Sequence, residues 1–462
     1  MKAAGATLKR LFLNKKGETD MTEGSILRHL LLFALPLLVG NIFQMLYNMV
    51  DTWVVGNFVS DAAFSAVGSV GPMINMLIGF FAGLSSGAGV VISQYFGAGK
   101  TDKVRDTVHT AMAITAILSV IFTVVGLLMI PVFLRFSNTP ETVIPESTAY
   151  LTIYFSGITG LLFYNMGAGI LRAVGDSTKP FLFLVVSAVI NTVLDLVFVL
   201  AFDLGVRGVA FATIIAQGAS ALLVLVTLMR TRSSVRFSFR CLTVKWGVLK
   251  KILRIGLPAA IQMAVTAFSN VFVQGYINQF GDATMGGWTA YGKIDQLLLL
   301  PAQSLALAST TFLGQNLGRG NVARAKKGLR TALVMSVSTS VILMIPVLIF
   351  APYLVAFFND SPAVVEYGTL FLRWISPFYV LCCFNQIYAG GLRGAGDSRA
   401  AMIIMLSSFV VFRQIYLFIV SNYISNTILP IAMAYPAGWF VASLLTYLYF
   451  RRVNLEKLRV VE

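Results

Sequence analysis

Two acidic residues stand inside stretches of the sequence that are otherwise apolar. Asp51 lies in LYNMVDTWVVGN, near the end of an apolar run that begins close to Ile26, and Asp195 lies in NTVLDLVFV. Asn191 precedes Asp195 by four residues, which places both side chains on one face of a helix. Thr213 adds a hydroxyl group in the next apolar run. Carboxylates, an amide and a hydroxyl are oxygen ligands suited to a small hard cation, and two neighbouring acids can also share a proton.

Other polar residues continue these helix faces. Gln44, Asn48 and Asp51 recur at spacings of three or four residues, and Ser187 stands four residues before Asn191. A second stripe of polar residues, which contains no acid, lies along the apolar segment that begins at residue 248. Polar groups inside apolar runs usually face a cavity or a partner, so we interpret several of them, with two charged residues from a later run that do not share a helix face directly, as a candidate substrate cavity. The set is Gln44, Tyr47, Asn48, Ser187, Gln262, Asn270, Lys293 and Asp295.

Membrane-spanning helices are the elements that would position these residues. The chain has 462 residues, 57% of them hydrophobic and 12% charged, whereas soluble domains are about 25% charged. Apolar runs longer than about 18 residues recur, which is typical of membrane spans. Regular alternation is absent, which argues against a lipid-facing β-barrel. Twelve spans are predicted, at 26–57, 62–98, 103–134, 143–171, 179–202, 207–230, 248–278, 283–318, 323–353, 363–392, 400–422 and 427–450.

The positions of the basic residues predict the orientation of these spans, because cytoplasmic loops carry an excess of Lys and Arg. With both termini in the cytoplasm, the external loops hold only Arg135 and Arg207 of the 35 Lys and Arg residues. Lys293, Arg373 and Arg413 fall within spans, and we expect the two arginines to extend toward the membrane surface. The sequence therefore predicts a multi-pass plasma-membrane protein whose net charge of +16 faces the cytoplasmic leaflet rather than a nucleic acid.

The sequence contains an internal duplication. SQYFGAGKTDKVR, from Ser93, matches GQNLGRGNVARAK, from Gly314, and GILRAVGDS, from Gly169, matches GGLRGAGDS, from Gly390, both at an offset of 221 residues. Each repeat holds six spans, an even number, so the two halves share one orientation and are expected to form an N-lobe and a C-lobe around a central cleft. The predicted boundaries are 1–25 for a cytoplasmic N-terminal segment, 26–230 for the N-lobe, 231–247 for a basic cytoplasmic linker, 248–450 for the C-lobe and 451–462 for a cytoplasmic tail.

The duplication does not extend to the acidic residues. At the repeat offset Asp195 corresponds to Tyr416, Asn191 to Phe412, Thr213 to Ala434 and Asp51 to Phe272 or Val273. Counted at about 1.5 Å per residue, the two acids and the threonine lie roughly 9 to 12 Å below the outer ends of their spans. We interpret Asp51, Asn191, Asp195 and Thr213 as one cation- or proton-coupling site, with Na⁺ as the candidate metal ion. The alternative is that the acids only stabilise helix kinks, although acids in a membrane are costly and usually functional.

The ordered motifs resemble those of a known transporter family. ALPLLVGNIFQMLYNMVDTWVVG, SQYFGAGK, LRAVGDSTKP, NTVLDLVFV and LGQNLGRG are similar to segments of the multidrug and toxic compound extrusion (MATE) transporters, over nearly the whole chain from Met21 onward. The resemblance implies secondary active antiport, in which inward sodium or proton flow drives the export of amphipathic, often cationic compounds. One branch of the family has a cation site made of two Asp, an Asn and a Thr, which by matching motifs fall on Asp51, Asp195, Asn191 and Thr213.

Another branch of that family uses acids in the C-terminal bundle. The corresponding helices of this chain carry Gln262, Thr266 and Arg373 instead, so no second cation site is expected. The main alternative function is a flippase or exporter of a lipid-linked or anionic substrate. The positive charges of Lys293, Arg373 and Arg413, set against Asp295, favour that alternative.

The sequence gives little indication of a catalytic site or of a nucleotide-binding site. QYFGAGKT ends like a phosphate-binding loop, but that motif requires Gly where Gln94 stands and a strand before it, so its glycines are expected to end a helix. His29 and His109 have no nucleophile or metal ligand nearby in the sequence and are expected at the surface. We expect no enzyme activity, no cofactor beyond the coupling ion, and no nucleotide or nucleic acid. The expected partners are small-molecule substrates and the lipid bilayer, with the protein a monomer.

Overall fold

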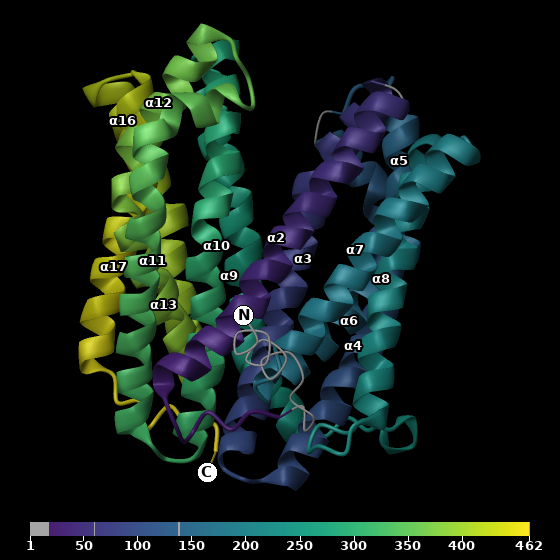
Figure 1. The fold of residues 1–462 in the computed structure, drawn as a ribbon, viewed down its shortest axis with the longest axis vertical. Coiled ribbons are helices and arrows are strands. Elements are labelled where there is room, and N and C mark those ends of the chain that lie inside the picture. Colours follow the sequence, from purple (N-terminus) through teal and green to yellow (C-terminus); the bar gives the residue numbers. More distant parts are fainter. Residues whose placement is uncertain (1–17, 60, 137–138, 462) are drawn as a thin grey trace, which may run out of the picture. The chain divides into compact units, whose positions relative to one another are not determined.

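The computed structural model describes residues 18–59, 61–136 and 139–461, and all regular structure in that part of the chain is helical (Figure 1). Most of the predicted cytoplasmic segment 1–25 lies outside the described residues. The first half of the sequence forms α2 (Ile26–Phe58), α3 (Asp61–Gly97), α4 (Thr101–Phe136), α5 (Ile144–Ser156), α6 (Ile158–Ala173), α7 (Thr178–Leu196), η1 (Val197–Ala201), α8 (Gly205–Arg230) and η2 (Phe239–Cys241). The second half forms α9 (Trp246–Asn278), α10 (Asp282–Gly318), α11 (Val322–Ala356), α12 (Pro362–Ile375), η3 (Ser376–Phe378), α13 (Tyr379–Ala395), α14 (Ser398–Leu406), η4 (Ser407–Phe412), α15 (Arg413–Ile419), η5 (Val420–Ile424), α16 (Ile428–Ala432) and α17 (Ala434–Arg452).

Within the described residues, 11 helical segments are long and apolar enough to cross a membrane. The remaining predicted span, 143–171, is present as α5 and α6, which meet at Gly157. A Cβ atom at Gly157 would lie 2.5 Å from Cβ of Ile214 in α8, so glycine is needed for this close approach. The prediction of an all-α polytopic membrane protein with twelve spans in two six-span repeats is confirmed, with one span broken in the middle.

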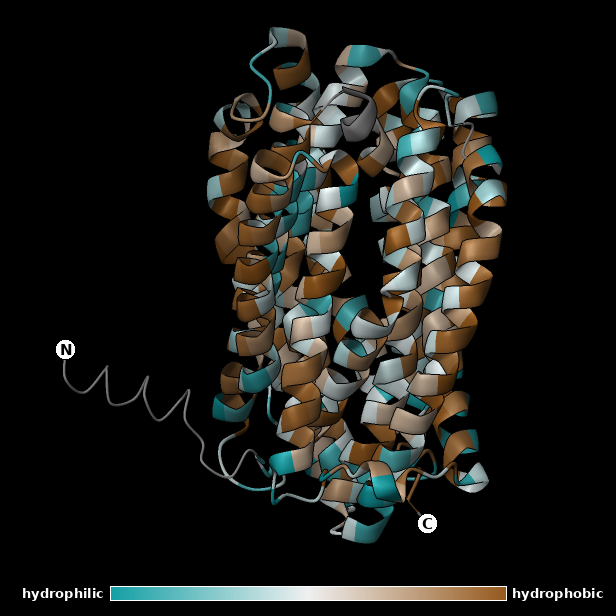
Figure 2. Ribbon diagram, turned by 90° about the vertical axis from the view of Figure 1, so that its right-hand side faces the viewer, coloured by the Kyte–Doolittle hydropathy of each residue, from teal (hydrophilic) through white to brown (hydrophobic). Residues whose placement is uncertain are grey.

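Hydrophobic residues predominate along the long helices, much of whose ribbon is brown in Figure 2, and many of their side chains are exposed. Leu128 on α4 is 72% exposed and Ile342 on α11 is 67% exposed. Soluble monomers rarely expose apolar patches this extensive, because apolar surface in water is unfavourable. In a bilayer the same surface faces hydrocarbon, and the helices satisfy their own backbone hydrogen bonds.

The chain forms two compact units, and two helices are shared between them. One unit comprises residues 1–20 and 35–256, and the other comprises residues 21–34 and 257–462. The first turns of α2 therefore belong to the second unit, and the first turns of α9 belong to the first unit. Each unit has its own core, with Tyr154 and Phe155 in the first and Trp288, Phe371 and Tyr379 in the second. The predicted lobe boundaries themselves stay a prediction.

Both shared helices change unit at a Leu-Pro pair of the duplicated sequence. Pro36 lies inside α2 and Pro258 inside α9, each directly after the unit boundary. Proline removes one backbone donor and loosens the helix at that turn, which transmembrane helices tolerate. Each Leu-Pro pair thus marks the point where a continuous helix passes from one packing environment to another.

The duplicated glycine motifs end two long helices, as the sequence predicts. Gly99 follows α3 with φ +69°, and Gly320 follows α10 with φ +85°. These left-handed conformations suit glycine, because other L-residues are strained there. In the second unit Gln315 Oε1 accepts a hydrogen bond of 2.9 Å from the backbone N–H of Met21. The motif therefore terminates a helix and anchors the segment that precedes α2.

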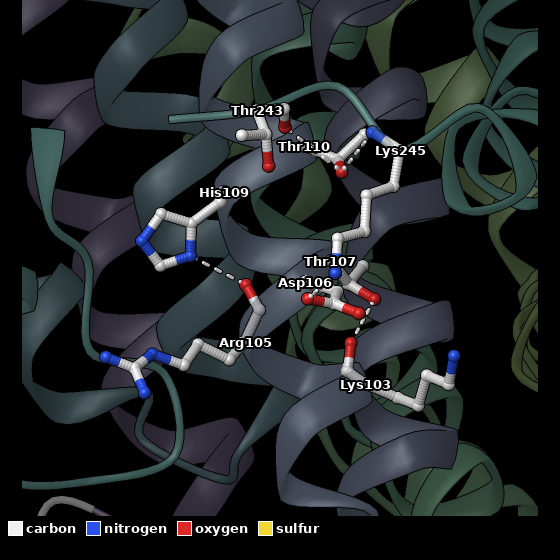
Figure 3. Close-up of polar contacts among 8 residues, drawn as sticks. All are labelled: Lys103, Arg105, Asp106, Thr107, His109, Thr110, Thr243 and Lys245. Carbon is white, nitrogen blue, oxygen red and sulfur yellow. Dashed lines mark hydrogen bonds and ion pairs between the residues drawn. The ribbon is translucent and has the colours of Figure 1, made fainter. Parts of the chain in front are cut away.

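The basic linker packs on the start of α4 (Figure 3). Lys245 Nζ lies 2.6 Å from Asp106 Oδ1, and the Lys245 backbone N–H donates to Thr110 Oγ1 at 3.2 Å. His109 is only 3% exposed, so the expectation of a surface histidine is wrong for this residue. Its Nε2 accepts from the Ser238 N–H at 3.2 Å and its Nδ1 lies 2.8 Å from the Arg105 carbonyl. The ring is buried because the linker, distant in sequence, folds over it.

Candidate cation and substrate sites

The four residues of the predicted coupling site come from three helices of the first unit. Asp51 lies on α2, Asn191 and Asp195 lie on α7, and Thr213 lies on α8. Asp195 is fully buried, Asn191 and Thr213 are 2% and 8% exposed, and Asp51 is half-buried. The α7 and α8 helices pack along one another, and Ser187 Oγ ties them by donating to the Ala216 carbonyl at 2.8 Å.

Several polar atoms of this cluster lack a well-formed hydrogen bond. Asp51 interacts directly with Asp195 and Asn191. Yet both carboxylate oxygens of Asp195, Oδ1 of Asp51 and both amide atoms of Asn191 are buried without a hydrogen bond. Buried polar groups are nearly always paired, and leaving them unpaired costs about 1–3 kcal/mol each. The cluster therefore fits an ion or a proton, either of which would satisfy these oxygens.

The oxygen ligands of this cluster suit a small hard cation. The described residues contain no group of three or more His, Cys, Asp and Glu side chains able to hold a metal. Thr213 Oγ1 donates to the Val209 carbonyl at 3.0 Å, which leaves its lone pairs available as a ligand. Two carboxylates, an amide oxygen and a hydroxyl can surround Na⁺, and the same two acids can share a proton.

Two tyrosines that the sequence reasoning missed complete the cluster. Tyr150 and Tyr154, both on α5, are 5% and 2% exposed, and their rings stack with centroids 6.2 Å apart. Tyr150 interacts with Asp51 and with Thr213, and Tyr154 interacts with Gln217. Their spacing of four residues on one helix face was the available signal. They supply hydroxyl groups at the site that could relay or hold a proton.

The predicted cavity residues of the first unit have different environments. Gln44 and Tyr47 are partly buried and Asn48 is exposed, all on α2 with Asp51. The Ser187 hydroxyl instead donates its hydrogen bond to α8. Tyr47 interacts with Asp51 and Gln44 interacts with Tyr47, while Ser187 acts in helix packing. Their assignment to a substrate cavity stays a prediction.

In the second unit, Lys293 and Asp295 lie in different environments. Lys293 is exposed, whereas Asp295 is partly buried and accepts hydrogen bonds from Tyr379 at 2.6 Å and Tyr291 at 3.1 Å. Gln262 has a buried carbonyl oxygen without a hydrogen bond. Asn270 is exposed, and its Oδ1 accepts from Arg413 Nη2 at 2.8 Å.

The two intramembrane arginines behave differently. Arg373 is exposed on α12, in line with the expectation that it extends outward. Arg413 is only 3% exposed, so the same expectation is wrong for this residue. Its side chain turns inward because Ser269 Oγ, Asn270 Oδ1 and the face of Tyr435 receive it.

Comparison with known proteins identifies the family. The MatE family model matches residues 36–197 and 258–419, one match in each repeat, and together they cover more than half of the chain. The chain belongs to the MATE family. It is similar to the probable multidrug resistance protein YpnP of Bacillus subtilis, at 29% identity over 432 residues that cover 94% of this chain and 96% of YpnP. It is also similar to the probable multidrug resistance protein NorM of Thermotoga maritima, at 26% identity over 98% of this chain and 97% of NorM.

A solved structure agrees with this assignment. A MOP superfamily transporter from Pyrococcus furiosus superposes with a TM-score of 0.89 and 23% identity, covering 96% of this chain and 99% of that one. At this identity the likeness establishes the fold. As a MATE family member, the protein is a multi-pass membrane transporter with small-molecule substrates, and the double match confirms the internal duplication.

Proposed function

We propose that the protein is a secondary active multidrug antiporter that exports amphipathic or cationic compounds by alternating access. Inward flow of sodium or protons drives the export, and Asp51, Asn191, Asp195 and Thr213 bind the coupling ion. The protein lies in the plasma membrane as a monomer with both termini in the cytoplasm, without a cofactor beyond that ion and without nucleotide. The names of the multidrug relatives support the substrate class.

One observation carries the coupling site. Five buried polar atoms of Asp51, Asn191 and Asp195 have no hydrogen bond, although all three residues interact. Binding of one Na⁺ or one proton supplies a partner for the unpaired oxygens and reduces the charge of the two ionised acids from −2 to −1, and ion release restores two adjacent negative charges in a medium of low dielectric. That difference gives the bound and free states different preferred helix packings. We propose that α2 adjusts at Pro36, where it passes between units.

The test is transport by purified protein in liposomes. Uptake of a fluorescent lipophilic cation is followed under an imposed sodium gradient and, separately, under an imposed proton gradient. We expect uphill transport with one of them and its loss in Asp51→Asn and in Asp195→Asn. Asp203→Asn is the matched control, because Asp203 is exposed beyond the end of the same helical hairpin. Wild-type transport in either site variant would refute the coupling site.

The alternative function remains an exporter or flippase of a lipid-linked or anionic substrate. The inward-facing Arg413 is the observation that favours it. Failure of both gradients to drive uphill movement of the cation, with retained movement of an anionic substrate, would favour this alternative over multidrug antiport.

A further inference from the structure

Arg413 is a buried cation within a membrane span and has no acidic partner. It begins α15, inside the span Ser398–Ile424, and is 3% exposed. Its Nη2 donates to Ser269 Oγ at 2.9 Å and to Asn270 Oδ1 at 2.8 Å, and neither acceptor is charged. None of the ion pairs found among the described residues includes Arg413. A buried charge is costly unless it is both paired and hydrogen-bonded, so this guanidinium is incompletely satisfied.

The guanidinium also has a buried donor, Nε, that makes no hydrogen bond. Arg413 Nε is buried without a hydrogen-bond partner, while Nη2 is occupied. Arginine presents its donors as a planar fork, which matches the two oxygens of a carboxylate or phosphate. The position of the unused donor therefore indicates an anionic ligand group and not a cation.

In the duplicated sequence, this arginine corresponds to a residue of the coupling site. The two family matches begin at 36 and 258 and end at 197 and 419, so the repeat offset there is 222 residues. With that offset Arg413 corresponds to Asn191, Tyr435 to Thr213 and Leu417 to Asp195. The second repeat thus puts a guanidinium at the position of the coupling site's amide, and an apolar residue at the position of Asp195.

A local change of helix geometry explains the register. The LRAVGDS and LRGAGDS motifs match at an offset of 221, one residue less than the family matches. The π-helical turn η4 (Ser407–Phe412) lies between that motif and Arg413, and a π-turn accommodates one extra residue. The expected correspondence of Asn191 with Phe412 is therefore shifted to Arg413.

Aromatic side chains lie next to the guanidinium. The Tyr435 ring lies 4.9 Å from the Arg413 guanidinium and its centroid lies 5.5 Å from that of Trp288. The Asp295 carboxylate accepts hydrogen bonds from two tyrosine hydroxyls and forms no ion pair with Arg413. Asn270, which holds the guanidinium, is itself exposed. A cation next to aromatic faces suits an amphipathic acid, with its anionic group on the arginine.

We propose that Arg413, with Asn270 and Tyr435, binds the acidic group of an amphipathic substrate, a carboxylate or a phosphate. The inference rests on the proposed export function and extends its substrates to organic anions and zwitterions. The anion can come from the exported compound or from the headgroup of an anionic lipid. Binding is measured without transport, so failure of antiport and failure of this site are distinguishable.

The experiment compares a rhodamine free acid with its methyl ester, two dyes with the same ring system that differ in one carboxylate. Their affinities for purified protein in phosphatidylcholine nanodiscs are measured by fluorescence polarisation. We expect wild type to bind the acid more tightly than Arg413→Gln does, by about 10- to 100-fold, because a hydrogen bond to a charged group is lost. Ester affinity should be unchanged. Arg413→Lys should recover part of the difference, and Arg373→Gln, an exposed arginine of the same unit, should match wild type.

The source of the anion follows from a second set of nanodiscs that contain phosphatidylglycerol. Weaker acid binding in these discs, in wild type but not in Arg413→Gln, would support the site and identify a lipid headgroup as its occupant. Unchanged acid binding there, with the difference from Arg413→Gln retained, would support the substrate's own acid. Equal affinities of wild type for acid and ester, with no effect of phosphatidylglycerol, would overturn the proposal even if Arg413→Gln failed to fold.

Discussion

A methyl group added at Gly87 is expected to force α3 and α9 apart. Within the first unit, a Cβ atom at this position would lie 2.4 Å from Cα of Gly256 and 2.7 Å from the Ile252 carbonyl oxygen. Carbon atoms in contact prefer about 3.5 to 4.0 Å. The obstructing atoms are backbone, so no side-chain rotation relieves the clash, and the helices must separate by roughly 1 Å.

The cost of Gly87→Ala follows from that separation. Overpacking of a tight contact costs about 1–3 kcal/mol, and we take the upper end because backbone meets backbone. The gain in helix propensity from Gly to Ala offsets about 1 kcal/mol. The net loss of about 2 kcal/mol should lower the thermal transition by roughly 4 °C or more.

The assay is thermal unfolding of the detergent-purified protein, followed by fluorescence-detected size exclusion. Gly71→Ala is the matched control, because Gly71 lies on the same helix and a Cβ atom there would meet nothing within 4 Å. We expect the control to equal or slightly exceed wild type. Equal transitions for Gly87→Ala and wild type would refute the close crossing of α3 and α9. Because Gly256 directly precedes the unit boundary, the result also tests which unit holds the start of α9.

Three further substitutions test local contacts. His109→Ala should destabilise the basic linker by about 1–3 kcal/mol, because buried backbone groups lose their partner, and limited proteolysis within 231–245 should accelerate. Asp106→Asn should change stability by at most about 1 kcal/mol, since its ion pair with Lys245 is largely exposed, and a shifted thermal transition would contradict this. Arg324 Nη2 donates to the backbone carbonyls of Met21, Glu23 and Gly24. Arg324→Lys should speed amide hydrogen exchange of residues 21–24, because lysine lacks the planar set of donors that reaches these carbonyls together. Unchanged exchange would argue that Arg324 does not hold this segment in place.

Local sequence patterns determined the spans, the duplication and the face that the acids share. A membrane span is fixed by the length and polarity of one continuous segment, so its position can be predicted without knowing its neighbours. Asn191 and Asp195 share a helix face for the same local reason. The motif match to a known family then extended these observations to a cation site, and the double family match supports the duplication.

Contacts between segments distant in sequence decided the features that local patterns did not predict. The break at Gly157 depends on how closely α8 approaches, which no local pattern encodes. Tyr150 joined the acid cluster, and His109 became buried, through packing against segments far away in the sequence.

Arg413 shows the limit of the sequence most clearly. An arginine in an apolar run can reach toward water by extending its chain, so the sequence predicts an outward side chain. Whether it turns inward depends on what the neighbouring helices offer, here a serine, an amide and an aromatic face from α9 and α17. The sequence determined that the charge lies in the membrane, and tertiary packing decided that it faces the protein, because only packing supplies its partners.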